Sequence, residues 1–430
     1  MSAILRKLKN NRFFRSLMML STGTIIAQLL AVLVSPILTR LLSEYELALF
    51  AFALSIVNTF QAGINGAYNN GIVVEENERK VRALIKLSLI VGIALSVLIG
   101  IGSYLYIVFF SKDNYPALLI AVFVFLTLLS VALIQTLTAY NNRRKDYKTI
   151  AAVGVYRSVF QNLGNVLSGL LGLGAPGLLF SFVAGNAAGI RRQAKEIKPE
   201  IPEIKAIPAS EVNAVAKENY RYPLFTAPSY FVNSLSFSSI TFFIEALFEF
   251  RLLAYYSMSM RILGLPLALI SANVGRIFMA DASSEYNKTG TFKRTFTRMS
   301  LFLSAVALPM GIVMFFFAPP LSRWAFGPGW EVAGEYIKIL TPMFLVRFIA
   351  TAVSPGYMIC GKQRTDALLQ GLLLAASVSA FLLAKWQSYP IESFLWAVSI
   401  FKSLVYLIYF FMLWWYSRKT RAIPSEGGTV

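Results

Sequence analysis

Several residue types on which most enzymes depend are rare or missing in this 430-residue chain. It contains no histidine and a single cysteine, Cys360, which excludes histidine-based catalysis, zinc sites built from histidine and cysteine, and an internal disulfide. No Walker A string, G-x-S-x-G motif or metal-binding motif occurs. We therefore expect a protein that is not an enzyme and uses neither a cofactor nor a metal.

Charged residues are also scarce. They make up 14% of the chain, whereas a soluble domain has about 25%. Hydrophobic residues reach 57% and the mean hydropathy is +0.62, so a soluble fold of this composition could not cover its surface with polar groups. The lipid bilayer must be the solvent for most of the chain.

The charges that are present are mostly positive, with 40 Lys and Arg against 21 Asp and Glu. A net charge of +19 often indicates nucleic-acid binding. Here the basic residues are dispersed over short loops between apolar segments, without a basic face that alternates with aromatics. Membrane topology explains them better, and we expect no nucleic-acid partner.

Apolar segments of about 20 residues, the length that crosses a bilayer, recur along the chain in two groups of six. The first is read as a retained helix and not as a signal peptide, because no small-residue cleavage site follows it. The expected spans are residues 16–39, 46–69, 84–110, 115–140, 149–171, 174–190, 222–245, 251–275, 297–318, 333–359, 366–386 and 392–416.

One long polar segment separates the two groups. Residues 191–218 contain three prolines and charges of both signs, which predicts a cytoplasmic linker. The expected organisation is an N-terminal lobe (1–190), this linker, a C-terminal lobe (219–421) and a polar tail (422–430).

The loop charges test this arrangement. Loops that would face the cytoplasm contain thirty Lys and Arg, and the opposite loops contain six. This asymmetry predicts that both termini are cytoplasmic and that the number of spans is even. With six helices each, the halves would insert the same way up, related by an axis along the membrane normal. The sequence thus predicts an all-α polytopic membrane protein with twelve transmembrane helices in two pseudo-symmetric six-helix lobes around a central cavity.

Four basic residues lie inside the expected spans and not in loops: Arg157, Arg261, Arg347 and Lys402. The last three lie 10 to 12 residues beyond the nearest preceding glutamate, namely Glu249, Glu335 and Glu392, which places them about 15–18 Å deep, near the middle of the bilayer. Each costs about 2.5–3.5 kcal/mol to insert, which favours a functional role.

Polar side chains also recur at helical spacing. Gln28 is in the first span, Asn58, Gln61 and Asn65 are in the second, and Gln161 follows Arg157 by one turn in the fifth. They could line a cavity and bind cargo, or they could join helices to one another, as such residues often do in membranes.

No Asp or Glu lies at the same depth as the four cations. Cation- or proton-coupled exporters usually need a buried carboxylate. A cavity with fixed positive charges and no carboxylate would select an anionic cargo. A phosphate or pyrophosphate fits, since guanidinium groups bind it through paired charge-assisted hydrogen bonds.

The chain resembles Wzx-type polysaccharide flippases of the MOP (multidrug/oligosaccharidyl-lipid/polysaccharide) exporter superfamily, in order and over almost its whole length. One departure is Glu46-Leu47, where relatives usually have glycine after the Glu-Tyr pair. The segments that carry the resemblance are GTIIAQLLAVLVSPILTRLLSEYELALFAFALS (23–55), YRYPLFTAPSYFVNSLS (220–236), MRILGLPLALI (260–270) and FAPPLSRWAFGPGWEVAGEYIKILTPMFLVRFI (317–349).

The resemblance implies a multi-pass protein of the bacterial inner membrane that moves an undecaprenyl-pyrophosphate-linked oligosaccharide, such as an O-antigen or capsule repeat unit, by alternating access. Other polysaccharide-assembly proteins would be its partners. Arg261 and Arg347 match positions where such flippases have cations that hold the pyrophosphate, whereas Arg157 and Lys402 depend on the depth argument alone. The amide side chains would then bind sugar hydroxyls.

Two other functions are compatible with a polytopic chain. A cation-coupled multidrug exporter of the same superfamily would need a buried carboxylate, which the spans lack. A membrane-embedded polymerase or glycosyltransferase would need a large external loop with catalytic residues, and the external loops are short.

Overall fold

The structure is a computed structural model that describes residues 12–111 and 115–419. These residues form helices joined by short turns, and none of the described residues belongs to a β-strand. The expected polar tail, residues 422–430, lies outside them. The helices form two compact units, unit 1 (residues 1–254) and unit 2 (residues 255–430), each of which is described by itself.

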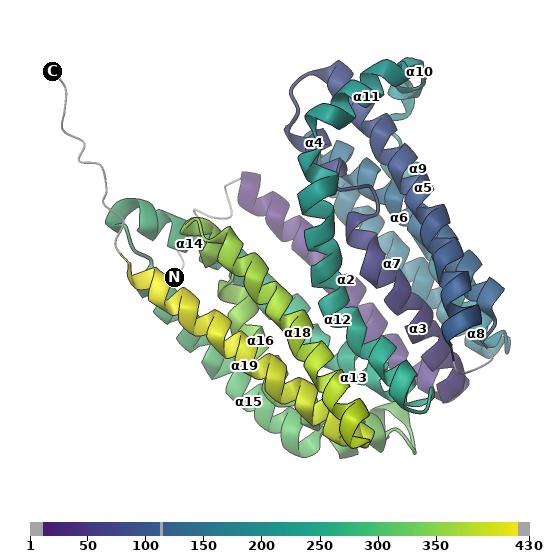
Figure 1. Cartoon of the computed structure of the whole chain (residues 1–430), viewed down its shortest axis with the longest axis vertical. Coiled ribbons are helices and arrows are strands. Elements are labelled where there is room, and N and C mark those ends of the chain that lie inside the picture. The colour runs from purple at the N-terminus through teal and green to yellow at the C-terminus, as the bar shows by residue number, and fades with distance from the viewer. Residues whose placement is uncertain (1–11, 112–114, 420–430) are drawn as a thin grey trace. The chain divides into compact units, whose positions relative to one another are not determined.

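In unit 1, α2 packs parallel to α7, whereas α5 and α6, and α7 and α8, pack as antiparallel pairs. Its elements (Figure 1) are α2 (Arg12–Leu41), α3 (Glu44–Phe60), η1 (Gln61–Gly63), α4 (Asn69–Val74), α5 (Glu78–Phe110), α6 (Ala117–Arg143), α7 (Tyr147–Leu170), α8 (Gly174–Ala188), α9 (Ile190–Gln193), η2 (Lys198–Glu200), α10 (Ile201–Ala206), α11 (Ala209–Glu218), η3 (Tyr222–Thr226) and α12 (Ala227–Leu247).

Unit 2 packs α16 against α15 and α19, and α18 against α19. A π-helical segment, η4, interrupts the helix that begins with α13, directly after Pro266. The elements are α13 (Leu252–Pro266), whose first turn begins in unit 1, η4 (Leu267–Ser271), α14 (Ala272–Thr289), α15 (Lys293–Phe326), α16 (Glu331–Val353), α17 (Gly356–Ile359), α18 (Gln363–Gln387) and α19 (Ile391–Arg418).

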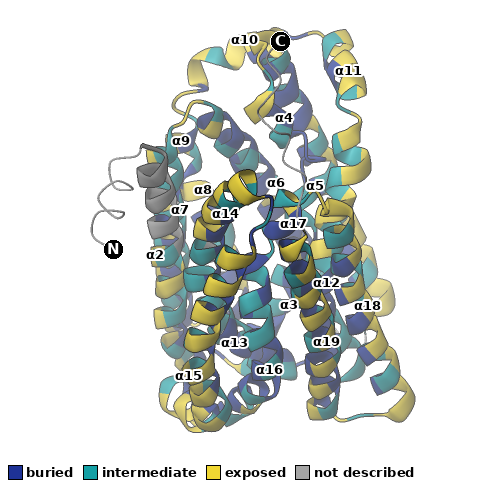
Figure 2. Cartoon of the chain, turned by 90° about the vertical axis from the view of Figure 1, so that its left-hand side faces the viewer, coloured by how far each residue is buried: buried dark blue, intermediate teal, exposed yellow. Residues whose placement is uncertain are grey.

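The predicted all-α polytopic membrane fold is confirmed. Among the described residues, nine helices are long and apolar enough to cross a membrane. The other expected spans correspond to α2, α7 and α8, so the helices are consistent with twelve spans. Many large apolar residues of these helices are exposed; Trp324 and Trp386 are each 80% exposed. Figure 2 shows such exposed positions along the outer helices. Such a surface suits lipid and not water.

The second expected span differs from the prediction. It starts at a capping box in which the Ser43 amide donates to the Glu46 carboxylate (2.8 Å) and the Glu46 amide donates to the Ser43 hydroxyl (3.3 Å). Glu46, the departure from the family pattern, therefore helps to start the helix. The α-helix ends at Phe60, and the chain turns at Gly66 and Ala67, which both have a φ of 59°. The continuous helix predicted for residues 46–69 is therefore wrong.

The mid-chain segment is folded onto unit 1. Residues 190–218, called the linker cap here, form α9, η2, α10 and α11, and both α10 and α11 contact α5. Their apolar side chains are buried in one cluster with apolar residues of α4, α5 and α6. The buried apolar residues of the cap are Ile197, Ile204, Ile207, Val212 and Val215.

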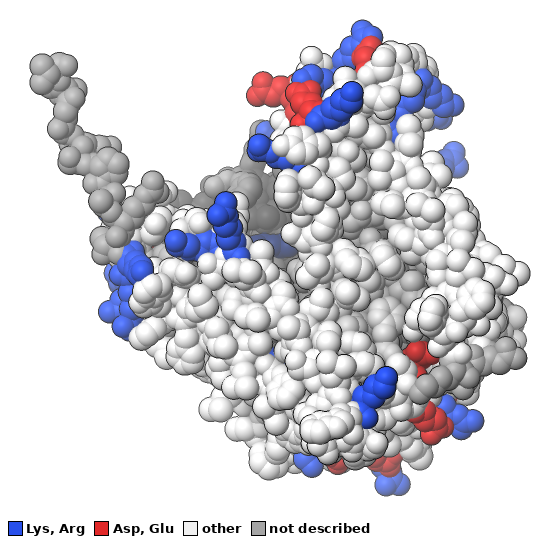
Figure 3. All heavy atoms as spheres, in the orientation of Figure 1, with Lys and Arg blue, Asp and Glu red and all other residues white. Residues whose placement is uncertain are grey.

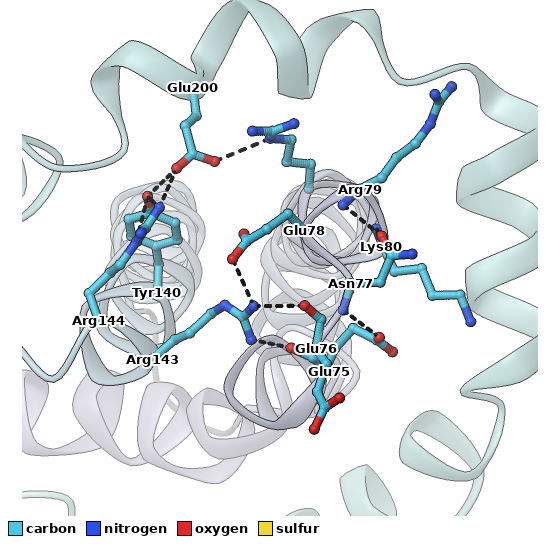
Figure 4. Close-up of polar contacts among 11 residues, drawn as sticks. Glu75, Glu76, Asn77, Glu78, Arg79, Lys80, Tyr140, Arg143, Arg144 and Glu200 are labelled. Atoms are coloured by element: carbon cyan, nitrogen blue, oxygen red, sulfur yellow. Dashed lines mark hydrogen bonds and ion pairs between the residues drawn. The ribbon is translucent and has the colours of Figure 1, made fainter.

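Ion pairs and hydrogen bonds surround this apolar cluster (Figure 4). Glu200 accepts hydrogen bonds from the Tyr140 hydroxyl, from Arg82 Nε (3.2 Å) and from Arg144 Nη2 (2.8 Å). Burial opposes the charge of Glu200, but these three donors outweigh that effect and lower the pKa of its carboxyl below the ordinary value. Glu200 is therefore ionised at neutral pH and joins the cap to α5 and α6.

Candidate substrate-binding site

Arg347 and Lys402 lie together inside unit 2. They project from α16 and α19, which pack against each other, and their charges are close enough to interact. Lys402 is 2% exposed and Arg347 is half-buried, with its guanidinium carbon 5.3 Å from the centre of the Phe344 ring. Two like charges in a largely apolar interior repel each other, and an anion bound between them would reduce that repulsion.

Two tyrosines complete this basic cluster. Tyr256 of α13 and Tyr406 of α19 are buried within electrostatic range of Arg347, and within the described part of the chain neither hydroxyl has a hydrogen-bond partner. A buried hydroxyl without a partner is costly, and a ligand oxygen could satisfy it. Two cations and two hydroxyl donors are the groups that a phosphate needs.

Arg261 lies on the neighbouring helix α13, half-buried. Two residues before it, the Ser259 hydroxyl donates to the carbonyl oxygen of Ala333 on α16 (2.7 Å). Beyond it, the Ser271 hydroxyl donates to the carbonyl oxygen of Phe348 (2.9 Å), the residue after Arg347. These bonds hold α13 and η4 along α16, so three of the four expected cations are in unit 2 on adjoining helices.

The fourth cation, Arg157, lines a separate cavity of about 290 Å³ inside unit 1. Its guanidinium donates to the amide oxygen of Asn186 on α8, while its Nε is buried without a partner among the described residues. Across the cavity Gln193 donates to Thr138 and has a buried side-chain oxygen that no described group satisfies. The cavity walls are Gly23, Ala27, Ile134, Thr138, Ile150, Ala151, Val153, Gly154, Arg157 and Gln193.

The expected amide residues are all in unit 1, but they do not share one face. Gln28 and Asn58 are exposed, and Gln61 donates to the Asn58 side chain (2.7 Å). Asn65 is fully buried and donates to the Ala132 carbonyl oxygen (3.0 Å) of α6. The face shared by Asn58, Gln61 and Asn65 was expected from a continuous helix, and the break after Phe60 removes it.

Gln161 lies at a close contact between α7 and α8. A β-carbon placed on Gly185 of α8 would be 2.8 Å from that of Gln161. Two turns further, the Ser168 hydroxyl is 3.0 Å from that of Ser181. The polar face of α7 therefore joins two helices within unit 1, and a role of Gln161 in binding cargo stays a prediction.

Four residues of these sites were not predicted from the sequence, namely Tyr256, Tyr406, Asn186 and Gln193. Tyr406 follows Lys402 by four residues, one helical turn, and could have been found from this spacing. Tyr256, Asn186 and Gln193 come next to the cations only through the packing of different helices, and no spacing in the sequence signals this.

The sequence matches the family described as "Polysaccharide biosynthesis protein" over residues 37–335, more than half of the chain. No curated protein matches it significantly.

Solved structures with similar folds include transporters and a lipid flippase. The lipid II flippase MurJ in an inward closed conformation aligns with a TM-score of 0.75 at 14% identity, over 92% of this chain and 87% of its own. An inward-facing MATE family multidrug resistance transporter of the MOP superfamily gives 0.70 at 12% identity, over 90% and 93%. A MOP superfamily transporter from Pyrococcus furiosus gives 0.61 at 12% identity, over 94% and 96%. At such low identities these similarities establish the fold alone.

Proposed function

Because this chain belongs to the polysaccharide biosynthesis protein family, we propose that it is a flippase for an undecaprenyl-pyrophosphate-linked oligosaccharide, such as an O-antigen or capsule repeat unit. It would move this lipid from the cytoplasmic to the periplasmic leaflet of the bacterial inner membrane by alternating access. Both chain termini would be cytoplasmic, and the protein would work beside other polysaccharide-assembly proteins.

The basic cluster of unit 2 carries this proposal. Arg347 and Lys402 would pair with the pyrophosphate, Arg261 would approach it from α13, and the hydroxyls of Tyr256 and Tyr406 would donate to its oxygens. These two hydroxyls are buried with no partner among the described residues, and an anionic headgroup supplies acceptors for both. The polyprenyl tail would remain in the surrounding lipid.

The cavity beside Arg157 supports a second contact with the same class of cargo. A volume of about 290 Å³ is at the lower limit of small-molecule pockets, a size suited to a single sugar ring. Arg157 offers a donor and the side-chain oxygen of Gln193 offers an acceptor, the combination that sugar hydroxyls use.

Transport by purified variants in liposomes tests the proposal. Arg347→Gln and Lys402→Gln each remove one charge-assisted contact, worth about 1.5–3 kcal/mol, so we expect translocation of a lipid-linked oligosaccharide to fall at least about tenfold. Lys385→Gln, which removes an exposed charge at the end of α18, is the matched control and should behave as wild type. Wild-type rates in both cluster variants, at equal amounts of folded protein, would contradict the assignment.

The same liposomes test the alternative, a cation-coupled multidrug exporter. Of the charged residues that the structure describes, only Lys402 and Glu245 are buried. Glu245 lies in the last turn of α12, where it accepts a hydrogen bond from Ser111 (3.1 Å). Transport of a cationic dye that depends on Glu245 and is unaffected by Arg347→Gln would favour the alternative.

A further inference from the structure

An open groove of about 750 Å³ lies in unit 2 where α14 meets α15. Three basic side chains and two threonines line it, together with one carboxylate and one leucine. The lining residues are Glu285, Thr291, Lys293, Arg294, Thr297, Arg298 and Leu301.

The positive charge of this groove is largely available to a ligand. Within the described part of the chain, Lys293, Arg294 and Arg298 form no ion pair, and all three are exposed. The carboxylate of Glu285 accepts the backbone amides of Arg294 (3.0 Å) and Thr295 (2.8 Å). It therefore caps the start of α15, and the basic side chains are left without an acidic partner.

The groove continues into an apolar stripe along α15. Arg294 and Arg298 are one turn apart, and the residues at the following helical positions on the same face are apolar and exposed. Leu301 is 66% exposed, Leu308 is 67% exposed and Ile312 is 49% exposed. The two guanidinium groups could bind a phosphate, and the exposed apolar side chains that follow them along α15 could contact the acyl chains attached to it.

Neighbouring indole rings indicate the depth of this groove. The Phe292 amide donates to the Ser417 carbonyl oxygen (3.2 Å), which joins the start of α15 to the end of α19. There the Arg418 guanidinium lies 3.5 Å from the centre of the Trp414 ring. Tryptophan is enriched at the headgroup level of membranes. At the end of unit 2 where α14 lies, Figure 3 shows Lys and Arg side chains with no Asp or Glu side chain visible among them.

We propose that this groove binds an anionic phospholipid of the surrounding bilayer. Arg294 and Arg298 hold its phosphate, Lys293 adds to the positive field, and the acyl chains lie along Leu301, Leu308 and Ile312. The site is distinct from the basic cluster around Arg347 and does not depend on the cargo assigned to that cluster.

Lipid titration of the purified full chain in a neutral detergent tests the site. Phosphatidylglycerol should raise the melting temperature of the wild-type protein, and phosphatidylcholine should not. The double variant Arg294→Gln, Arg298→Gln should need at least tenfold more phosphatidylglycerol for the same rise. Arg191→Gln, Arg192→Gln removes a pair of exposed arginines from α9 and should leave the response unchanged.

Photo-cross-linking of the wild-type protein provides a test that does not depend on the folding of a variant. A photoreactive phosphatidylglycerol should attach mainly to residues 293–312. Equal attachment by a phosphatidylcholine probe, an even spread over all interfacial helix ends, or an unchanged lipid response in the α15 double variant would overturn the proposal. Labelling of this segment by a polyprenyl-pyrophosphate probe alone would assign the groove to the cargo and would overturn it equally.

Discussion

Lys402 is buried in unit 2 with its charge near that of Arg347, so the two like charges repel each other. We expect Lys402→Met to leave the free energy of unfolding unchanged or to raise it by up to about 4 kcal/mol, because an apolar chain of similar size removes both the repulsion and the cost of a buried charge. The same variant should lose transport. Thermal melting in detergent, compared with Lys385→Met, measures the effect on stability; a large drop in melting temperature would show that Lys402 is structural.

Substitution of Asn65 should lower stability and leave transport almost unchanged, the opposite of what we expect for Lys402. Its side chain joins the turn after Phe60 to α6, through Ala132 and Thr136 (2.9 Å). Asn65→Ala removes two buried hydrogen bonds, each worth about 0.5–1.5 kcal/mol, so we expect a loss of about 1–3 kcal/mol in stability. Transport per folded molecule should change little. Asn58→Ala, at an exposed position, is the control; a selective loss of transport in Asn65→Ala with unchanged melting would support the role in cargo binding predicted from the sequence.

These residues show which site features are readable from a sequence. The depth of Arg347 and Lys402 follows from counting residues along a helix, since a helix rises 1.5 Å per residue. The direction of the Asn65 side chain could not be obtained in this way. It depends on a turn that rotates the chain, and on the position of α6, some 70 residues further along.

Among the elements, the second span shows where a helical pattern misleads. Amides at intervals of about four residues favour one helix through residue 69, whereas Gly63 and Gly66 are positions at which a helix can be interrupted. The packing of the linker cap could not be predicted for a different reason. Prolines and mixed charges are typical of a loose linker, but its burial depends on apolar partners in α4, α5 and α6 that local sequence does not reveal.

The contribution of the linker cap to stability should depend on pH. The pKa of Glu200 is lowered in the folded protein, so its contribution to stability is present above the ordinary pKa of a glutamate, about 4.3, and is lost as the pH falls below it. We expect Glu200→Gln to lower the melting temperature at pH 7, and this difference from wild type to shrink towards pH 4. Glu196→Gln, an exposed position in the same cap, controls for charge; a difference that does not depend on pH would contradict the ion-pair role.

Contact between α15 and α16 depends on a small residue. A β-carbon at Gly334 would lie 2.6 Å from the carbonyl oxygen of Ala318 and would also meet Pro319. We expect Gly334→Ala to cost about 1–3 kcal/mol, as for other overpacked sites. Gly371→Ala, in open space on α18, should instead stabilise its helix by up to about 1 kcal/mol. Melting of the two variants side by side checks the difference, and equal behaviour would contradict the close packing.

At the scale of the whole molecule, composition alone predicted the fold class correctly. A chain with 57% hydrophobic residues needs internal backbone hydrogen bonds in lipid, and long helices provide them. Sequence also predicted the approximate position of most spans. The boundary between compact units could not be read from it, because α12 and the start of α13 belong to unit 1 through contacts such as that between α3 and α12.

Topology gives a prediction for the whole chain. The thirty-to-six distribution of basic loop residues implies that both termini are cytoplasmic. A reporter that is active only in the periplasm should therefore be inactive when fused to the C-terminus or inserted after Arg143, and active when inserted between α7 and α8. Periplasmic activity of the C-terminal fusion would contradict an even number of spans.

The burial of the linker cap has a consequence for protein engineering. A segment midway between two halves is usually where tags, protease sites or circular permutation points are tolerated. Here five apolar side chains from that segment are part of a packed interior, so an insertion there should disrupt folding as much as one inside a transmembrane helix. Variation among natural homologues should accordingly be low at Ile204, Val212 and Val215, and cargo chimeras should be joined outside residues 190–218.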